Sequence, residues 1–278
     1  METANPNREF KDSVFTALFG TPEKALELYN AINGSNYSDS TKVKMVTLPD
    51  ALYGEQLNDV AFVIENKLVV LIEHQSTINK NIPLRMLLYI GREYELLTNS
   101  RDIYKSERIS IPAPEFVVLY NGEREMEDFV EMRLSDLFAF DAKDPQYAPC
   151  LELVVKAYNI NKGRNSEIAA KSPSLSDYEE FIAAVRENQK TMDFREAVKA
   201  SIRGCISRNI FVDFLRMYGA EVENMLLTEW NMETALEVRF EEGVLMTARR
   251  MKAKGLNTAL IAEITGLSED EIKGLKQD

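Results

Sequence analysis

Residues 58–76 read NDVAFVIENKLVVLIEHQS, and this stretch decides the fold. Two apolar runs rich in β-branched residues flank the polar segment Glu65-Asn66-Lys67, which is the pattern of a β-hairpin. Successive positions of both runs are apolar, so each strand is expected to have both of its faces covered within a sheet. The stretch therefore predicts two central strands joined by a tight turn.

The length of that turn determines which side chains face one another across the hairpin. If the three polar residues form the loop, Ile64 pairs with Leu68, and counting outward sets Asp59 directly against Glu73. A two-residue turn is the alternative, and in that case we expect Asp59 opposite His74 and the two acids apart. We predict the three-residue turn, with both carboxylates on one face at one end of the hairpin.

The residues around Glu73 complete this predicted cluster. Side chains alternate between faces along a strand, so Gln75 shares the face of Glu73, whereas His74 points to the other face. His74 is the only histidine of the chain, and its position favours a packed or hydrogen-bonded core residue over a catalytic base.

Two carboxylates that face each other repel unless a cation lies between them. Hard oxygen ligands of this kind suit Mg²⁺ or Mn²⁺. Such an ion polarises a phosphodiester and activates a water molecule. We therefore predict a Mg²⁺ (or Mn²⁺) site formed by Asp59, Glu73 and the backbone carbonyl of His74. The alternative without a functional role is that the two acids are solvated residues at the ends of the strands.

Helices and one further strand are predicted around the hairpin. Apolar spacing indicates helices over residues 10–18 and 22–33, and Pro83 opens a third, of about 15 residues. Leu84, Leu87, Leu88 and Gly91 are expected on the inner face of the third helix. Residues 115–120 form a buried strand that ends at Asn121-Gly122. This order indicates an α/β fold with a mixed sheet flanked by helices.

The second half of the sequence is predicted to be mainly helical. Helical spacing recurs over residues 177–188, 194–207 and 220–253. The last segment pairs residues 257–265 with 269–275 around Gly266-Leu267-Ser268, which resembles a helix-turn-helix hairpin. We expect a core domain over residues 1–150 and a helical C-terminal region over residues 151–278.

Several segments, taken in order, resemble the recombination-promoting nuclease/transposase family of the PD-(D/E)XK nuclease superfamily. They are residues 10–20 (FKDSVFTALFG), 58–76, 84–89 (LRMLLY), 118–122 (VLYNG) and, in the tail, residues 254–256 (KGL) followed by 261–268 (IAEITGLS). The resemblance implies a restriction-endonuclease-like core, metal-dependent cleavage of DNA and a link to DNA recombination or transposition. It also implies a homodimer, because nucleases of this type commonly cut both strands as dimers.

The same resemblance assigns catalytic positions to Asp59, Glu73, Gln75 and Asp12. Gln75 occupies the position of the superfamily lysine, as it does in many relatives, and so removes the cation that would orient water or stabilise the leaving group. Arg85 or Lys80 is expected to supply charge from nearby, with Arg85 as a phosphate contact. The alternative for Arg85 is a solvated ion pair on its helix.

The charge balance favours a second hypothesis. The formal net charge is −12, which counts against a simple nucleic-acid binder, because such proteins gain affinity from Lys and Arg on phosphates. A catalytically inactive, nuclease-fold interaction module that acts through oligomer or protein-partner contacts is therefore the alternative to an enzyme. No secretory signal is evident at the start of the sequence, and no uninterrupted apolar stretch in it approaches the ~20 residues of a membrane span, so we expect a cytoplasmic protein.

Overall fold

The computed structural model describes residues 13–46, 58–74, 79–98, 101–139 and 150–275. The side chains of residues 58–59, 72–74 and 228–242 lie outside the description. The chain divides into two compact units, Met1–Met225 and Leu226–Asp278.

A six-stranded mixed sheet forms the centre of the first unit, in the order β1-β2-β3-β4-β6-β5. Strands β3, β4 and β6 run parallel, and the remaining neighbours pair antiparallel. The described strands are β1 (Val43–Val46), β2 (Asn58–Ile64), β3 (Lys67–His74), β4 (Ala113–Tyr120), β5 (Phe129–Arg133) and β6 (Val154–Asn159). The hairpin is thus internal to the sheet, and the predicted α/β class with a mixed sheet is confirmed.

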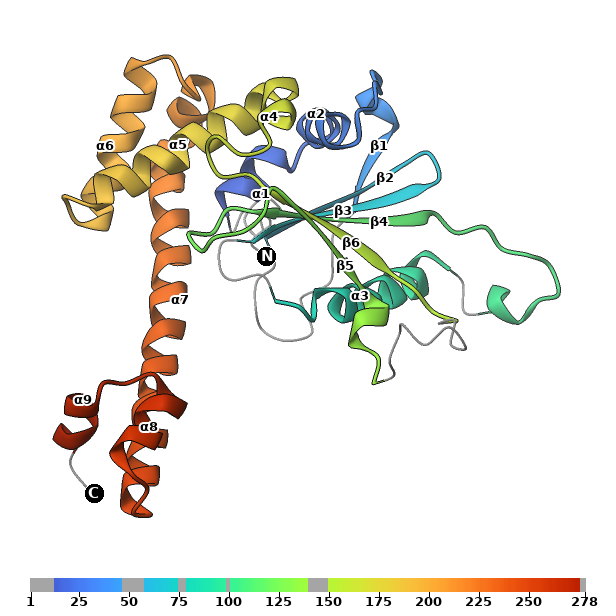
Figure 1. The fold of residues 1–278 in the computed structure, drawn as a ribbon. Helices are drawn as coiled ribbons and strands as arrows, with labels where there is room; N and C mark the ends of the chain where they lie inside the picture. Colours follow the sequence, from blue (N-terminus) through green and yellow to red (C-terminus); the bar gives the residue numbers. More distant parts are fainter. Residues whose placement is uncertain (1–12, 47–57, 75–78, 99–100, 140–149, 276–278) are drawn as a thin grey trace, which may run out of the picture. The chain divides into compact units, whose positions relative to one another are not determined.

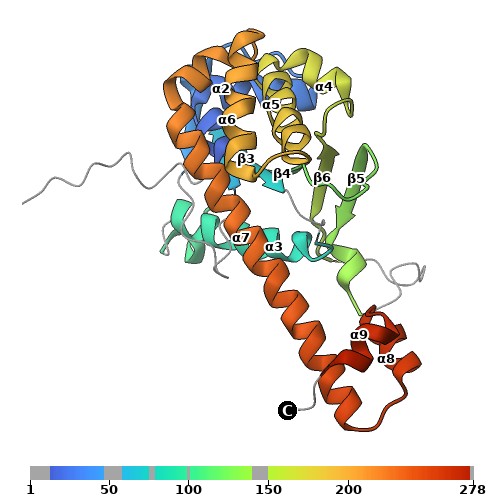
Figure 2. The ribbon, with the colours of Figure 1, turned by 90° about the vertical axis from the view of Figure 1, so that its left-hand side faces the viewer.

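Helices cover both faces of the sheet (Figure 1). The face that carries α1 (Val14–Phe19) and α2 (Pro22–Asn33), here called the α1 face, packs Phe62 edge-on against Tyr29, with ring centroids 5.8 Å apart. Helices α4 (Ser166–Lys171), α5 (Pro173–Gln189) and α6 (Phe194–Ser207) follow on the same side (Figure 2). Thr21 caps α2 and Gly34 ends it in the left-handed conformation, so the range predicted for this helix, residues 22–33, is confirmed.

Helix α3 (Ile82–Leu97) covers the opposite face, here called the α3 face. The predicted inner side of this helix is wrong except for Leu87, which packs partly buried against the core. Its buried side is formed by Ile82, Met86 and Ile90, whereas Leu84 and Leu88 are 43% and 42% exposed. The helix carries apolar residues on more than one side, and the set spaced by four from Ile82 fits the sheet better than the set predicted from Leu84.

The sheet extends past the predicted domain boundary. Strand β6, at Val154–Asn159, pairs with both β4 and β5, so residues 1–150 do not contain the whole sheet. The boundary expected between residues 150 and 151 falls inside the first unit, which reaches Met225 and includes α4, α5 and α6. The second half of the chain is mainly helical apart from this strand, as predicted.

The second unit contains the end of α7 (Val212–Ala253), followed by α8 (Thr258–Thr265) and α9 (Glu269–Gly274). Ala248, Ile261 and Ile272 form its small core. Gly266 adopts φ 74°, and Ser268 closes a capping box at the start of α9. The predicted terminal helical hairpin is therefore confirmed. Among the described helices, none is both long enough and apolar enough to cross a membrane.

Candidate functional site

The hairpin turn contains two residues, Glu65 and Asn66, because Ile64 pairs with Lys67. The predicted three-residue turn is therefore wrong. The observed register sets Asp59 against Ile72, rather than against Glu73 or His74. Glu65 permits this short turn because its backbone adopts the left-handed region, at φ 52°. Glutamate rarely takes this conformation, so the sequence around Glu65 does not predict it.

This register separates the two candidate acids by one rung of the ladder. Glu73 pairs with Asn58, and Asp59 takes the next rung. Successive rungs alternate between the faces of a sheet, so the strand position of Glu73 belongs to the α1 face and that of Asp59 to the α3 face. The directly opposed pair of carboxylates predicted from the turn is absent from this pairing.

The backbone positions of Asp59, Glu73 and His74 nevertheless lie at one border of the sheet. Strands β3, β4 and β6 are parallel, and one line of rungs joins His74 to Tyr120 and Tyr120 to Asn159 at their carboxyl ends. Strand β2 runs the other way, so its first residues, Asn58 and Asp59, lie at the same edge. Open α/β sheets bind ligands at the carboxyl ends of their parallel strands. We call this border the carboxyl edge, and it is the candidate site.

One buried and one half-buried amide organise the loops that leave the carboxyl edge. Asn159, 3% exposed, donates from Nδ2 to the carbonyl oxygen of Met126 at 2.9 Å. Asn161 donates from Nδ2 to the carbonyl oxygen of Gly122 and to Oδ1 of Asn159, each at 2.9 Å. These bonds fix the ends of β4 and β6 together, which makes this part of the edge a rigid platform.

A cation from α5 lies on this platform. Nη1 of Arg186 donates to Oδ1 of Asn161 at 2.6 Å and to Oδ1 of Asn121 at 3.3 Å. Nη2 of the same side chain donates to the backbone carbonyl of Asn121. Neither Arg186 nor these amides was predicted from the sequence to be functional. The sequence feature that could have indicated them is the occurrence of polar residues where parallel strands end. Asn121-Gly122 follows β4, and Asn159-Ile160-Asn161 lies at the end of β6.

The structure describes only some of the other predicted residues. Asp12 and Gln75 lie outside the described residues. Arg85 lies half-buried on α3, on the face opposite to that of α1, and Lys80 is exposed just before this helix. His74 ends β3, where its backbone is paired with that of Tyr120, and its side chain lies outside the description.

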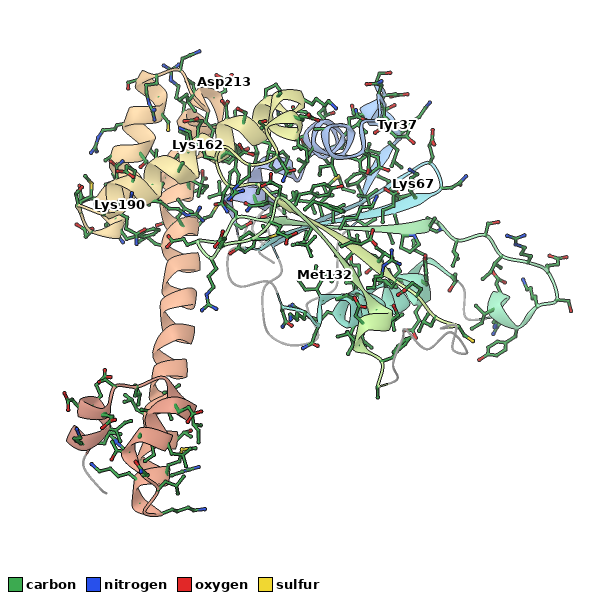
Figure 3. All side chains as sticks on the ribbon, viewed as in Figure 1. Tyr37, Lys67, Met132, Lys162, Lys190 and Asp213 are labelled. Carbon is green, nitrogen blue, oxygen red and sulfur yellow. The ribbon has the colours of Figure 1, made fainter. Side chains whose placement is uncertain are left out.

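The opposite end of the same strands holds a different polar network. Nζ of Lys67 lies 2.8 Å from Oε1 of Glu115 and donates to the hydroxyl of Tyr29 at 3.0 Å, while that hydroxyl donates to Oε2 of Glu115 at 2.8 Å. Figure 3 labels Lys67 at this end and Lys162, in the loop after β6, at the carboxyl edge. The network ties α2 to the sheet far from the candidate site, so its role is structural.

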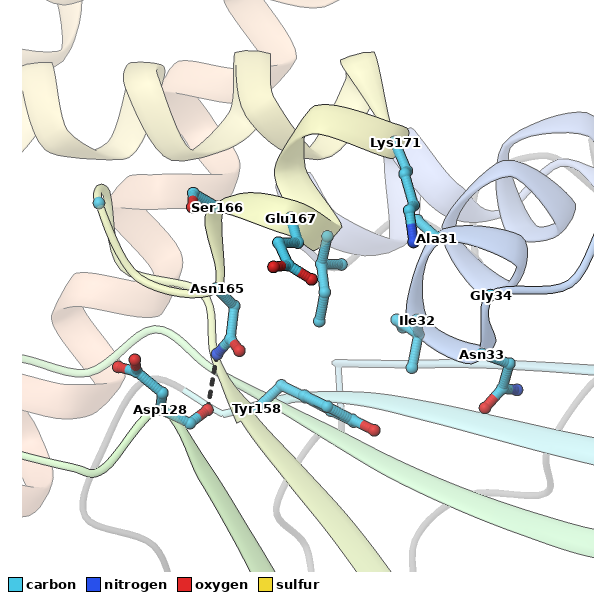
Figure 4. Close-up of a pocket in the computed structure, with 12 residues that line it drawn as sticks. Ala31, Ile32, Asn33, Gly34, Asp128, Tyr158, Asn165, Ser166, Glu167 and Lys171 are labelled. Carbon is cyan, nitrogen blue, oxygen red and sulfur yellow. Dashed lines mark hydrogen bonds between the residues drawn. The ribbon is translucent and has the colours of Figure 1, made fainter.

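A surface cleft of about 570 Å³ opens between α2, β6 and α4 (Figure 4). Ile32 and Tyr158 contribute to its lining, together with Glu167 and Lys171. Asn165 donates from Nδ2 to the backbone oxygen of Asp128 at its rim, at 2.6 Å. The described lining residues include none of the predicted catalytic positions, and Gly163 and Asn165 among them belong to the loop that leaves the carboxyl end of β6.

Among the described side chains, no group of three or more His, Cys, Asp or Glu is arranged to hold a metal ion. The side chains of Asp59 and Glu73 are not among those described. Comparison of the chain with protein-family models, with curated proteins and with solved structures finds no match.

Proposed function

We propose that this chain is a metal-dependent DNA endonuclease that hydrolyses phosphodiester bonds at the carboxyl edge. The observation that carries the proposal is the placement of Glu73 at the end of β3, on one rung with Asn58 and one rung from Asp59. Acidic strand ends at this border of a mixed sheet are where an α/β fold binds its ligand. The interpretation of this fold as nuclease-like comes from the resemblance of its sequence motifs to the nuclease family.

The donors at this edge are carboxylate, amide and carbonyl oxygens, which suit Mg²⁺ or Mn²⁺. Glu73, Asp59 and the carbonyl of His74 would hold the ion, and Asn58 adds an amide on the rung of Glu73. The ion would polarise the scissile phosphate and supply an activated water. Gln75 and Asp12 would orient water beside it, and Arg85 would contact phosphate. A homodimer that cuts both strands and a role in recombination or transposition belong to the same proposal.

Nicking of supercoiled plasmid DNA tests this function. The wild type is expected to nick with Mg²⁺ or Mn²⁺ and to be inactive in EDTA, and Asp59→Asn and Glu73→Gln are each expected to abolish nicking. Glu107→Gln, in the exposed segment between α3 and β4, removes a carboxylate away from the edge and serves as the control. Equal nicking by wild type, Asp59→Asn and Glu73→Gln would contradict the proposal.

The hairpin register favours a second candidate, a nuclease-fold module without catalysis that acts through oligomer or protein contacts. Carboxylates on successive rungs of a regular ladder belong to opposite faces, which weakens a shared metal site. Calorimetric titration of folded protein with Mn²⁺ separates the candidates. A saturable site that is lost in Glu73→Gln supports the enzyme, whereas the absence of a saturable site supports the module.

A further inference from the structure

Arg186 is held in a defined orientation at the carboxyl edge. Its guanidinium bonds to the ends of two strands, through Asn121 after β4 and Asn161 after β6, and its side chain remains 28% exposed. A guanidinium has five N–H donors, and these bonds do not occupy all of them. The cation is therefore both fixed by the protein and open to solvent on one side.

The amide of Asn121 is oriented by this cation. Its Oδ1 accepts from Arg186, so its Nδ2 must point elsewhere. Asn121 is 2% exposed, and within the described part of the chain its Nδ2 has no acceptor. Buried donors without a partner are rare in folded proteins, and each calls for an explanation. A ligand oxygen that enters beside Arg186 would give this N–H an acceptor.

Both groups belong to the face of Glu73. Glu73 pairs with Leu119 in the parallel ladder of β3 and β4, and Asn121 follows two residues later. Asn121 lies one residue past the end of β4, neighbouring strands lie about 4.8 Å apart, and Arg186 comes from α5, which lies on the α1 side of the sheet (Figure 2). The strand position of Glu73 and the Asn121–Arg186 pair are therefore adjacent on the α1 face.

We propose that Arg186 and Asn121 form a phosphate-binding position that accepts a non-bridging oxygen of the DNA backbone next to the catalytic carboxylates. This inference rests on the proposed function and extends it to a cation that replaces the missing lysine at Gln75. A planar guanidinium with a neighbouring N–H donor matches the geometry of a phosphate. Glu123, 77% exposed with Oε1 3.8 Å from Nε of Arg186, is the carboxylate that the phosphate would displace.

Another role for Arg186 is that of a clamp that only ties α5 to the sheet. Asn121→Asp distinguishes the two roles, because the substituted side chain has nearly the same shape and keeps an oxygen facing Arg186. A clamp would be retained or strengthened by the added charge. A phosphate position would lose both its N–H donor and much of its positive potential.

The experiment measures binding of a fluorescein-labelled 20-base-pair DNA duplex by anisotropy in EDTA, so that no cleavage occurs. Asn121→Asp and Arg186→Gln are each expected to weaken binding about tenfold and to reduce the salt dependence by about one phosphate contact. Glu123→Gln is expected to strengthen binding. Arg133→Gln removes a partly exposed arginine from the other end of the sheet and is expected to bind as the wild type does.

Circular dichroism and thermal unfolding establish that each variant is folded. Wild-type affinity in folded Asn121→Asp would overturn the inference even if Arg186→Gln fails to fold. The result is also separable from the proposed function, because Glu73→Gln should stop nicking yet keep duplex binding in EDTA. Loss of nicking in Glu73→Gln together with unchanged binding in Asn121→Asp would support the nuclease function and contradict the proposed phosphate-binding position.

Discussion

Nζ of Lys67 lies 2.8 Å from Oε1 of Glu115, and the Tyr29 hydroxyl bonds to both residues. Burial opposes ionisation of Glu115, but the hydrogen bonds from Lys67 and Tyr29 outweigh it and lower the pKa of this carboxyl. The pair is partly exposed, so Lys67→Met should lower the free energy of unfolding at pH 7 by only about 1 kcal/mol.

The stability difference between wild type and Lys67→Met depends on pH because folding lowers the pKa of Glu115. A carboxyl whose pKa is lowered by folding stabilises the fold above its ordinary pKa, and this stabilisation is lost as the pH falls through the lowered value. Urea unfolding should therefore show the difference between wild type and Lys67→Met shrinking in acid. Lys105→Met, which breaks an exposed pair with Asp102, is the control and should change stability by less than about 0.5 kcal/mol. A difference that grows in acid would refute this account.

Glu179 on α5 shows the opposite shift. The side chain is 7% exposed and its Oε1 has no partner among the described residues, so burial, with a contribution from Glu180, raises its pKa to about 8. Folded protein keeps this proton between pH 4.5 and about 8, whereas the unfolded chain releases it, so stability falls as pH rises through that window. Glu179→Gln is expected to be more stable than wild type at pH 8 by about 1–3 kcal/mol.

Urea denaturation at pH 5 and pH 8 checks this prediction. The gain from Glu179→Gln should be large at pH 8 and small at pH 5, because Glu179 is already protonated in the folded wild type at the lower pH. Glu187→Gln, at an exposed position near the end of the same helix, should leave the pH dependence unchanged. An equal gain at both pH values would mean that packing, not protonation, accounts for the effect.

Lys252 closes the end of α9 in the second unit. Its Nζ donates to the backbone oxygens of Ile272, Lys273 and Leu275 at 2.9, 2.8 and 2.9 Å. The last carbonyls of a helix have no intrahelical N–H partner, and of these three the oxygen of Ile272 also accepts from the backbone N–H of Leu275 at 3.3 Å. Lys252→Met keeps the aliphatic stem but removes the donors, so it should destabilise this unit by about 1–3 kcal/mol.

Hydrogen exchange followed by mass spectrometry locates that effect. Amides of α8 and α9 should exchange faster in Lys252→Met, while those of β3 and β4 keep the wild-type rate. Lys254→Met removes an exposed lysine two residues away and is the matched control. Unchanged exchange in α8 and α9 would show that the three bonds contribute little.

The central part of the fold was predictable because its signals are local. Runs of β-branched residues mark β2 and β3, and Thr21 and Gly34 mark the limits of α2. Strand β6 was missed because Lys156 interrupts a short apolar segment within a mainly helical half of the chain. The inner side of α3 was misjudged because apolar residues occur around much of that helix, and only the shape of the sheet selects Met86 and Ile90.

The candidate site was predictable in its location but not in its details. The carboxyl edge follows from acids at the ends of predicted strands, whereas Arg186 reaches Asn121 across 65 positions of the sequence. No periodicity or spacing reveals a contact at that separation. The register of the hairpin depends on one backbone angle, at Glu65, and no sequence rule assigns a left-handed conformation to glutamate.

Glu65 provides a direct test of that register. An L-residue in the left-handed region costs about 1–2 kcal/mol relative to glycine. Glu65→Gly should therefore raise the free energy of unfolding by about 0.5–1 kcal/mol after the added entropy of the unfolded chain is subtracted. The loss of the long 3.4 Å bond from the Tyr37 hydroxyl to Oε2 of Glu65 is a minor cost, because the contact is exposed.

Asn66→Gly is the matched control for this substitution. Asn66 lies in the same two-residue turn but outside the left-handed region, so glycine there brings the entropic cost without relieving strain. In urea unfolding, Glu65→Gly should be more stable than wild type and Asn66→Gly less stable. The reverse order would indicate that Asn66, not Glu65, holds the strained position. The turn would then differ from the one that sets Asp59 against Ile72, and the direct pairing of Asp59 with Glu73 would again be open.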